Sequence, residues 1–239
     1  MTANNVALPP VASAEAWQQA SKALLAREKE LTRAQDALAA ARRRLPMVPV
    51  TQAYSFTGPE AELSLLDLFQ GRRQLIVYCA MLEPGANPCP GCSMVMDNMG
   101  HNLAHVHARD TSFVFTSAAP QHEIIALQQR MGWNSPWYSD HGRRFADAFG
   151  AGKGFALNVF IRDDAKHVYR SYFSTNRGGE LFDTNFRLLD LTPYGRQETW
   201  EDSPVGWPQT PPYAWWRLHD AYDAVSGAGD GTHAAVPAA

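Results

Sequence analysis

Gln74-Leu75-Ile76-Val77-Tyr78-Cys79 and, ten residues after it, Cys89-Pro90-Gly91-Cys92 are the stretches that decide the fold of this chain. The first is an apolar run that predicts a fully buried strand, and the residues from Ser93 to His107 predict a helix. Two cysteines separated by two residues can cycle between dithiol and disulfide without large backbone motion. A CxxC pair between a strand and a helix therefore favours redox chemistry.

The position of the motif gives its two cysteines different expected roles. Cys89 falls where the unpaired N–H groups and the dipole of a helix N-terminus stabilise a thiolate, the species that attacks disulfides. Cys92 would then resolve the mixed disulfide from within the first turn. Two alternatives remain open: an inert structural pair, and half of a zinc site, although no second CxxC is present to complete one. No cofactor is expected.

The composition limits the classes of partner. The chain has 239 residues, 45% of them hydrophobic, and a formal net charge of −3, enough for one sizeable domain with appendages. This charge gives no reason to expect nucleic acid or a membrane as a partner. The N-terminus lacks a signal-peptide pattern, and no apolar run approaches the roughly 20 residues of a membrane helix. We therefore expect a cytoplasmic protein, in which three cysteines are more often catalytic or buried thiols than structural disulfides.

The order of the expected elements predicts an α/β fold with a mixed central sheet flanked by helices. The first central strands would pair in parallel, and the last two would form an antiparallel hairpin around residues 163–166. This is the thioredoxin-type arrangement. Strands are expected at 50–56, 74–80, 111–117, 137–139, 155–162 and 167–173, and helices at 64–69, 93–107 and 120–131.

A long helix is predicted over residues 14–46, ahead of a domain at 47–222 that includes a C-terminal extension; residues 1–13 and 223–239 are expected to be disordered. The apolar residues of the helix form a narrow seam that suits pairing with another helix. The helix either lies across its own domain or pairs antiparallel with a second subunit in a homodimer. The seam repeats every seven residues, at Trp17, Leu24, Leu31, Leu38 and Leu45.

Asp97, His101 and His105 are weak candidates for a metal site. They recur every four residues, so they share one face of the predicted helix, and His-x-x-x-His can chelate a metal. A solvated polar face is the simpler interpretation, because no fourth ligand is evident. Cys79 ends a buried strand, which favours a packed free thiol, although it is also a possible third thiol that resolves a disulfide with the motif.

Aromatic residues near the end of the predicted sheet are candidates for a binding cleft. Trp133 and Trp137 bracket Asn134-Ser135-Pro136, and Tyr138 follows. These side chains either wall a cleft or fill the core.

Several further stretches between about Ala14 and Tyr222 carry a resemblance in combination. They are Glu28–Ala34, Leu45–Val48, Gln74–Tyr78, Cys89–Ser93, Met131–Trp133 with Pro136–Ser139, Leu188–Pro193 and Arg217–Asp220. Together they resemble the thioredoxin-like domain-of-unknown-function family number 899. The resemblance implies a thioredoxin-like core with an added N-terminal helix and a C-terminal extension, and it implies no activity.

The chain departs from related patterns at three places. Cys79 stands where members of that family commonly have His. Lys153-Gly154-Phe155-Ala156 lacks the cis-proline that thioredoxins carry just before this strand, and the Pro-x-x-x-Thr-x-x-Cys pattern of peroxiredoxins is missing before Cys89. These departures set the chain apart from ordinary members of both classes.

The sequence favours a thiol–disulfide redox protein that uses Cys89 and Cys92 on a thiol or disulfide substrate, either a protein or a small molecule. One alternative is peroxiredoxin-like reduction of peroxide through a sulfenic acid at Cys89. The other is a non-enzymatic protein that binds copper or zinc through Cys89 and Cys92, with or without Cys79.

Overall fold

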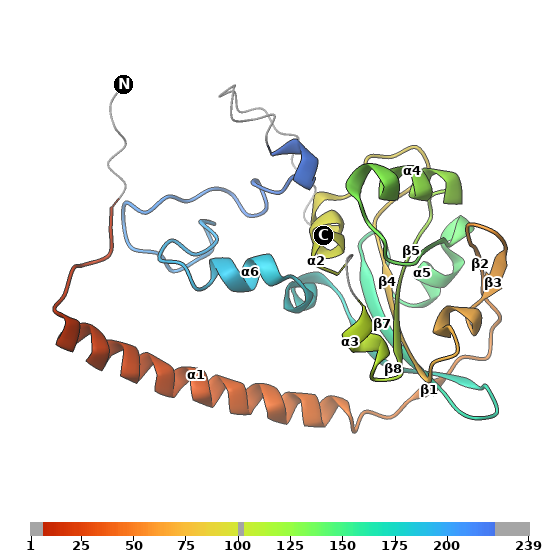
Figure 1. Ribbon diagram of the computed structural model, residues 1–239, viewed down its shortest axis with the longest axis horizontal. Helices are drawn as coiled ribbons and strands as arrows, with labels where there is room; N and C mark the ends of the chain where they lie inside the picture. Colours follow the sequence, from red (N-terminus) through yellow and green to blue (C-terminus); the bar gives the residue numbers. More distant parts are fainter. Residues whose placement is uncertain (1–6, 100–102, 223–239) are drawn as a thin grey trace.

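One mixed sheet organises this computed structural model, which describes residues 7–99 and 103–222 (Figure 1). Within those ranges the sheet has eight strands in the order β1-β8-β7-β4-β5-β6-β2-β3. The outer strands are short, and the four central strands make up most of the sheet. The bounds are β1 Val48–Pro49, β2 Ser55–Thr57, β3 Glu62–Ser64, β4 Gln74–Cys79, β5 Thr111–Ser117, β6 Trp137–Ser139, β7 Ala156–Arg162 and β8 Val168–Ser174.

The central strands confirm the predicted thioredoxin-like fold. β4 pairs in parallel with β5 on one side and antiparallel with β7 on the other, and β7 forms an antiparallel hairpin with β8. β4 and β5 are rich in Val, Ile and Phe, as expected of strands covered on both faces. The sheet therefore reads β8-β7-β4-β5 across its centre, with the CxxC motif after its first central strand.

Helices cover both faces of the sheet and bury two clusters. α2 (Pro90–Met99) and α4 (Gln121–Met131) contribute to the cluster that contains Tyr78 and Cys92. α5 (Arg144–Ala148) and the 3-10 helix η1 (Asp67–Phe69) contribute to the cluster on the opposite face. Because side chains alternate along a strand, neighbouring residues of β4 enter different clusters.

The helix predicted over 93–107 is wrong in its extent. α2 is described as far as Met99, Leu103 is not helical, and a separate short helix, α3, spans Ala104–His107. The sequence has Gly100 and Asn102 between them, residue types with low helix propensity. The apolar period continues through this break, and for that reason the pattern alone suggested a single helix.

The segment before β4 also differs from the prediction. The structure has the shorter β2 in place of the expected strand at 50–56, and the shorter η1 in place of the expected helix at 64–69. β2 pairs with β3 in a hairpin, and β3 includes the first residue of the expected helix. The turn begins at Gly58, whose N–H donates to the carbonyl oxygen of Ala61 at 2.8 Å. An added Cβ on Gly58 would lie 3.0 Å from the same oxygen, so a larger residue here would require the turn to shift by a few tenths of an ångström.

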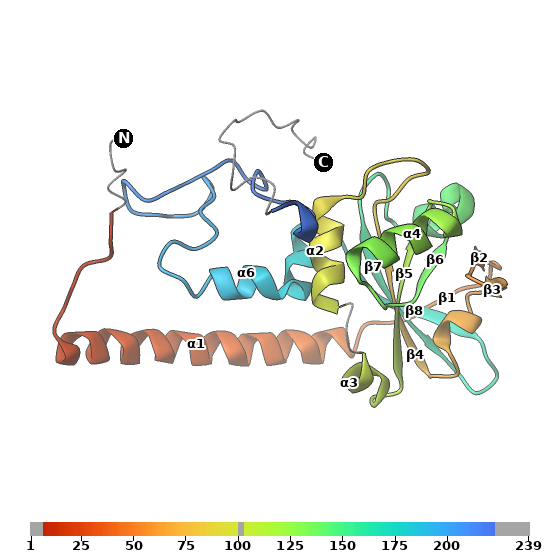
Figure 2. The same ribbon diagram turned by 45° about the horizontal axis from the view of Figure 1, so that its top comes forward.

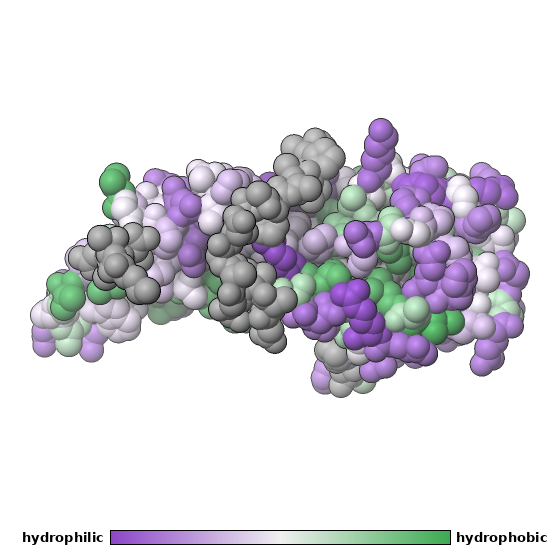
Figure 3. Space-filling view, turned by 90° about the horizontal axis from the view of Figure 1, so that it is seen from above, coloured by the Kyte–Doolittle hydropathy of each residue, from purple (hydrophilic) through white to green (hydrophobic). Residues whose placement is uncertain are grey.

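The N-terminal helix α1 (Ala14–Arg42) forms one side of an arm (Figure 1), and Figure 3 shows this arm extending from the globular body. It begins at Ser13, whose Oγ accepts a hydrogen bond from Ala16 N at 3.2 Å. None of its residues is buried, and the four seam members within it, Trp17, Leu24, Leu31 and Leu38, are 52–66% exposed. The helix is shorter than the predicted 14–46, so Leu45, the fifth seam member, lies beyond its end. Within the described chain, the seam is not covered by the protein's own domain.

The C-terminal residues form the other side of the arm and run back to α2 (Figure 2). They include α6 (Thr184–Leu189) and the 3-10 helices η3 (Asn176–Phe182) and η4 (His219–Ala221). The buried carboxylate of Glu198 accepts hydrogen bonds from the indoles of Trp200 and Trp215, which fixes the course of this extension. No described helix has the length and apolar character needed to cross a bilayer. The predicted disorder at 1–6 and 223–239 concerns residues outside the described ranges, whereas residues 7–13 are described and contact the extension at Tyr194.

Candidate functional site

The CxxC motif lies at the carboxyl end of β4, where the chain enters α2. Cys89 immediately precedes the helix, and its carbonyl oxygen accepts hydrogen bonds from the N–H and the hydroxyl of Ser93 at 3.0 and 2.9 Å. Cys92 lies in the first turn and is 4% exposed, while Cys89 is only partly buried. Both sulfurs are free thiols. The motif therefore presents one reachable sulfur in front of one enclosed sulfur.

The environment of Cys89 favours its thiolate. The pKa of Cys89 is lowered to about 6, first by a hydrogen bond from the Cys92 side chain and then by the backbone N–H groups of Cys92 and Gly91; burial opposes the shift. These N–H groups belong to the first turn of α2, where no earlier carbonyl is available to them. At neutral pH, Cys89 is the charged member of the pair.

The environment of Cys92 favours its neutral thiol. Its pKa lies well above the ordinary value, because it donates to Cys89 and because it is buried. Two donors nevertheless point at its sulfur: the hydroxyl of Tyr78 at 3.6 Å and the backbone N–H of Met81 at 3.4 Å. Burial keeps Tyr78 protonated by raising its pKa well above the usual range. Tyr78 and Met81 are thus part of the sulfur environment.

Sequence reasoning did not assign a role to Tyr78. The signal was available in the alternation of β4, since Tyr78 must enter the face that α2 covers if Cys79 enters the other. The ring of Phe155 stacks on Tyr78, with centroids 5.3 Å apart and planes 9° from parallel. Phe155 directly precedes β7, in the segment where the sequence lacks proline. Where the sequence lacks proline, an aromatic residue therefore packs on the tyrosine that contacts Cys92.

Cys79 lies on the far face of the sheet from the motif. It is 2% exposed and packs in the cluster with α5. Burial raises its pKa to about 12. This placement favours the packed free thiol over a third redox cysteine.

Trp133 and Trp137 lie in the core, each 4% exposed, with ring centroids 6.1 Å apart. Their indole N–H groups donate to Asp97 Oδ1 at 2.7 Å and to Ser117 Oγ at 3.0 Å. Tyr138 points to the other face and packs against the opposite cluster. The structure does not bring the three together as the wall of one cleft.

The candidate metal ligands are only partly described. Asp97 is engaged by Trp133 and by His219, whose Nδ1 lies 2.6 Å from Asp97 Oδ1. His105 is exposed on α3, beyond the end of α2, and His101 lies outside the described residues. Over the described ranges, no three His, Cys, Asp or Glu side chains come close enough together to hold a metal ion.

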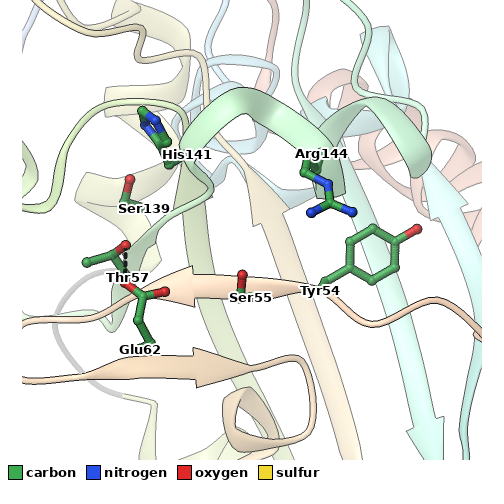
Figure 4. Close-up of a pocket in the computed structure, with 7 residues that line it drawn as sticks. All are labelled: Tyr54, Ser55, Thr57, Glu62, Ser139, His141 and Arg144. Carbon is green, nitrogen blue, oxygen red and sulfur yellow. Dashed lines mark hydrogen bonds between the residues drawn. The ribbon is translucent and has the colours of Figure 1, made fainter.

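A polar hollow of about 380 Å³ lies elsewhere on the body (Figure 4). It lies between the β2–β3 hairpin and the segment after β6, and the hydroxyl of Thr57 donates to Glu62 within it at 2.6 Å. None of its lining residues belongs to the sulfur site. They are Tyr54, Ser55, Thr57, Glu62, Ser139, His141 and Arg144.

Comparison with protein families gives one match that covers most of the chain. The model of a family described as "Bacterial protein of unknown function (DUF899)" matches residues 6–222. A search of curated proteins finds no match.

Comparison with solved structures gives similarities of low identity. Peroxidoxin BcpB from Mycobacterium tuberculosis is 20% identical, with a TM-score of 0.39 over 61% of this chain and 96% of that one. A PrxQ mutant from Xylella fastidiosa is 15% identical, with a TM-score of 0.39 over 55% and 87%. A structure from Chlorobium tepidum, whose description suggests a thiol:disulfide interchange protein DsbE, is 12% identical, with a TM-score of 0.40 over 60% and 97%. These values leave the activity open.

Proposed function

The chain belongs to the DUF899 family of bacterial proteins, whose description names no activity, and we propose its function from its own sulfur chemistry. It is a thiol–disulfide redox protein that uses Cys89 and Cys92. The observation that carries this proposal is the opposite shift of two neighbouring thiols. The pKa of Cys89 is lowered to about 6 and that of Cys92 is raised well above its ordinary value. Such a pair has one thiolate that can attack a disulfide and one protonated thiol that can resolve the mixed disulfide.

The reaction proceeds in two balanced exchanges. The Cys89 thiolate attacks one sulfur of a substrate disulfide, so that a Cys89–substrate S–S bond forms and the substrate S–S bond breaks, its electron pair leaving on the other sulfur. Cys92 gives its proton to that departing thiolate and attacks Cys89 Sγ, which releases the second substrate thiolate. The protein ends as a Cys89–Cys92 disulfide, and a dithiol reductant reverses both exchanges.

The neighbours of Cys92 support its role in the second exchange. Negative charge must develop on a sulfur that is 4% exposed, where solvent gives little help. The Tyr78 hydroxyl and the Met81 N–H already point at this sulfur and remain donors as the charge appears.

Thiol trapping by mass spectrometry tests the proposal. Reduced, metal-free protein is equilibrated across glutathione redox buffers, and each cysteine is quantified separately. We expect a reversible Cys89–Cys92 disulfide with a midpoint within roughly −120 to −270 mV, the range of known redox proteins. Thiols that stay reduced throughout contradict the proposal.

Variants assign the two roles. Cys92→Ser should accumulate a mixed disulfide on Cys89, and Cys89→Ser should form none; Cys79→Ser is the matched control and should behave like the wild type. If hydroperoxide converts Cys89 to a sulfenic acid while disulfides do not react, the alternative of peroxide reduction replaces the proposal.

We also propose that α1 pairs antiparallel with α1 of a second copy and that the protein works in the cytoplasm. The exposed seam has a large residue every seven positions, with alanines between most of them, so two copies of one seam can pack closely. α1 carries four acidic and five basic side chains, so two copies do not repel each other strongly. The three free thiols fit a reducing compartment.

A further inference from the structure

The C-terminal extension crosses the CxxC motif. Residues 211–222, which we call the strap, leave the arm, pass the first turn of α2 and end in η4 (Figure 2). A segment in this place decides what can reach Cys89.

The strap touches the motif through Trp216. The ring lies against Gly91, between the two cysteines: a Cβ added to Gly91 would lie 2.5 Å from Trp216 Cζ3 and 3.0 Å from Cε3. Gly91 is therefore required by this contact. Trp216 is itself held by Tyr213 and Phe186, with ring centroids 4.3 and 5.8 Å away.

Three contacts fasten the strap just after this ring. Arg130 of α4 forms a two-pronged ion pair with Asp220, at 2.8 and 3.1 Å. His219 contacts Asp97 of α2, and Leu218 packs on the cluster that contains Cys92. The strap is thus attached to both helices that cover this face of the sheet.

A second part of the extension covers Phe155 in the segment before β7, whose ring stacks on Tyr78. Gly179 of η3 lies so close to Phe155 that a Cβ there would overlap the phenyl ring. Thr175 Oγ1 donates to the carbonyl oxygen of Phe155 at 2.6 Å, so this backbone acceptor is also occupied. Both the motif and the segment before β7 are covered by the chain's own residues.

We infer that Cys89 is open to small disulfides and thiols and closed to polypeptides, with Trp216 as the residue that sets this limit. A polypeptide disulfide brings chain on both sides of its sulfur and needs free surface around the attacking thiolate. A small disulfide needs only the opening above Cys89, which is partly exposed. The substrate class rests on the proposed function, whereas the shielding of Cys89 does not.

Alkylation with reagents of one chemistry and two sizes tests the shielding. The Cys79→Ala/Cys92→Ser background leaves Cys89 as the reacting thiol, and the rates with N-ethylmaleimide and with a maleimide on 5-kDa polyethylene glycol are compared. We expect the small reagent to be favoured strongly when Trp216 is present and Trp216→Ala to lower that preference at least about tenfold. An equal preference in both proteins overturns the inference.

Control variants separate shielding from general loosening. Trp216→Phe keeps a ring on Gly91 and should keep most of the preference. Trp207→Ala removes an indole from the same extension, where it packs on Tyr194 with centroids 5.3 Å apart, and should change nothing. If Trp216→Ala fails to fold, Asp220→Asn loosens the strap without touching the motif and should lower the preference in the same direction.

Turnover assays then distinguish the two proposals. Protein with all three cysteines should exchange with glutathione disulfide but not measurably with oxidised insulin chains, and Trp216→Ala should gain the second activity. Exchange with both substrates at similar rates in the wild type overturns the inference. If size-dependent alkylation is found but neither disulfide reacts, the shielding stands and the proposed function fails.

Discussion

The low pKa of Cys89 should depend on the side chain of Cys92. The hydrogen bond from Cys92 is the largest of the influences that lower this pKa to about 6, ahead of the backbone N–H groups. Cys92→Ala removes that donor and leaves the backbone groups and the burial in place. We therefore expect the pKa of Cys89 to rise toward the ordinary value near 8.5.

The size of the effect follows from the thiolate fraction. At pH 7, a thiol with a pKa of about 6 is about 90% ionised, and one with a pKa near 8.5 is about 3% ionised. A less acidic thiol is also intrinsically more nucleophilic, which offsets much of this about 30-fold loss when rates are compared. The midpoint of a pH profile is therefore the better readout than a rate at one pH.

The assay is iodoacetamide alkylation of Cys89 between pH 4 and 10, resolved by peptide mass spectrometry so that Cys79 and Cys92 do not contribute. Cys92→Ser is the matched control, because its hydroxyl can still donate; its midpoint should lie between those of the wild type and of Cys92→Ala. If all three proteins share one midpoint, the hydrogen bond from Cys92 does not cause the low pKa.

Other changes have equally definite outcomes. Tyr78→Phe removes a donor to Cys92 Sγ, so release of the mixed disulfide should slow about fivefold, as for a hydrogen bond of about 1 kcal/mol, with the first attack changed less than about twofold in stopped-flow traces. Native Cys89 binds fewer protons than the unfolded chain between about pH 6 and 8.5, so in urea titrations the free energy of unfolding should rise by about 2–3 kcal/mol over that window. This stabilisation should be lost as the pH falls through about 6, and Cys89→Ala should remove the rise. In sedimentation experiments Leu31→Glu should convert a dimer to a monomer, whereas Val205→Glu, at a fully exposed site outside α1, should not; a wild type that is monomeric at every concentration contradicts the pairing.

The centre of the fold was predictable because its signals are local. β4 and β5 are unbroken apolar runs, and the hairpin of β7 and β8 is marked by the polar turn at 163–166, so their order and directions followed from the sequence. The break between α2 and α3 was missed because the apolar period continues through it. The hairpin of β2 and β3 was missed because each strand has only three residues, too few for a period.

The sulfur site was predictable in its cysteines and not in its surroundings. The CxxC spacing and its place before a helix identify Cys89 and Cys92 directly. Tyr78 could have been assigned from the alternation of β4, but Trp216 is 125 residues beyond Gly91 in the sequence, and no local pattern connects the two. The contact depends on the path of the whole C-terminal extension, which has little regular secondary structure and so leaves no periodic signal.

The fastening of the strap has a consequence for the order in which the protein is made. Its two polar attachments join residues 90 and 122 positions apart, so they close only after most of the chain has been synthesised. β4, β5, α2 and α4 are complete well before residues 211–222 leave the ribosome. The nascent protein therefore passes through a period in which Trp216 does not yet shield Cys89, and a chaperone or another polypeptide has access to that sulfur only then.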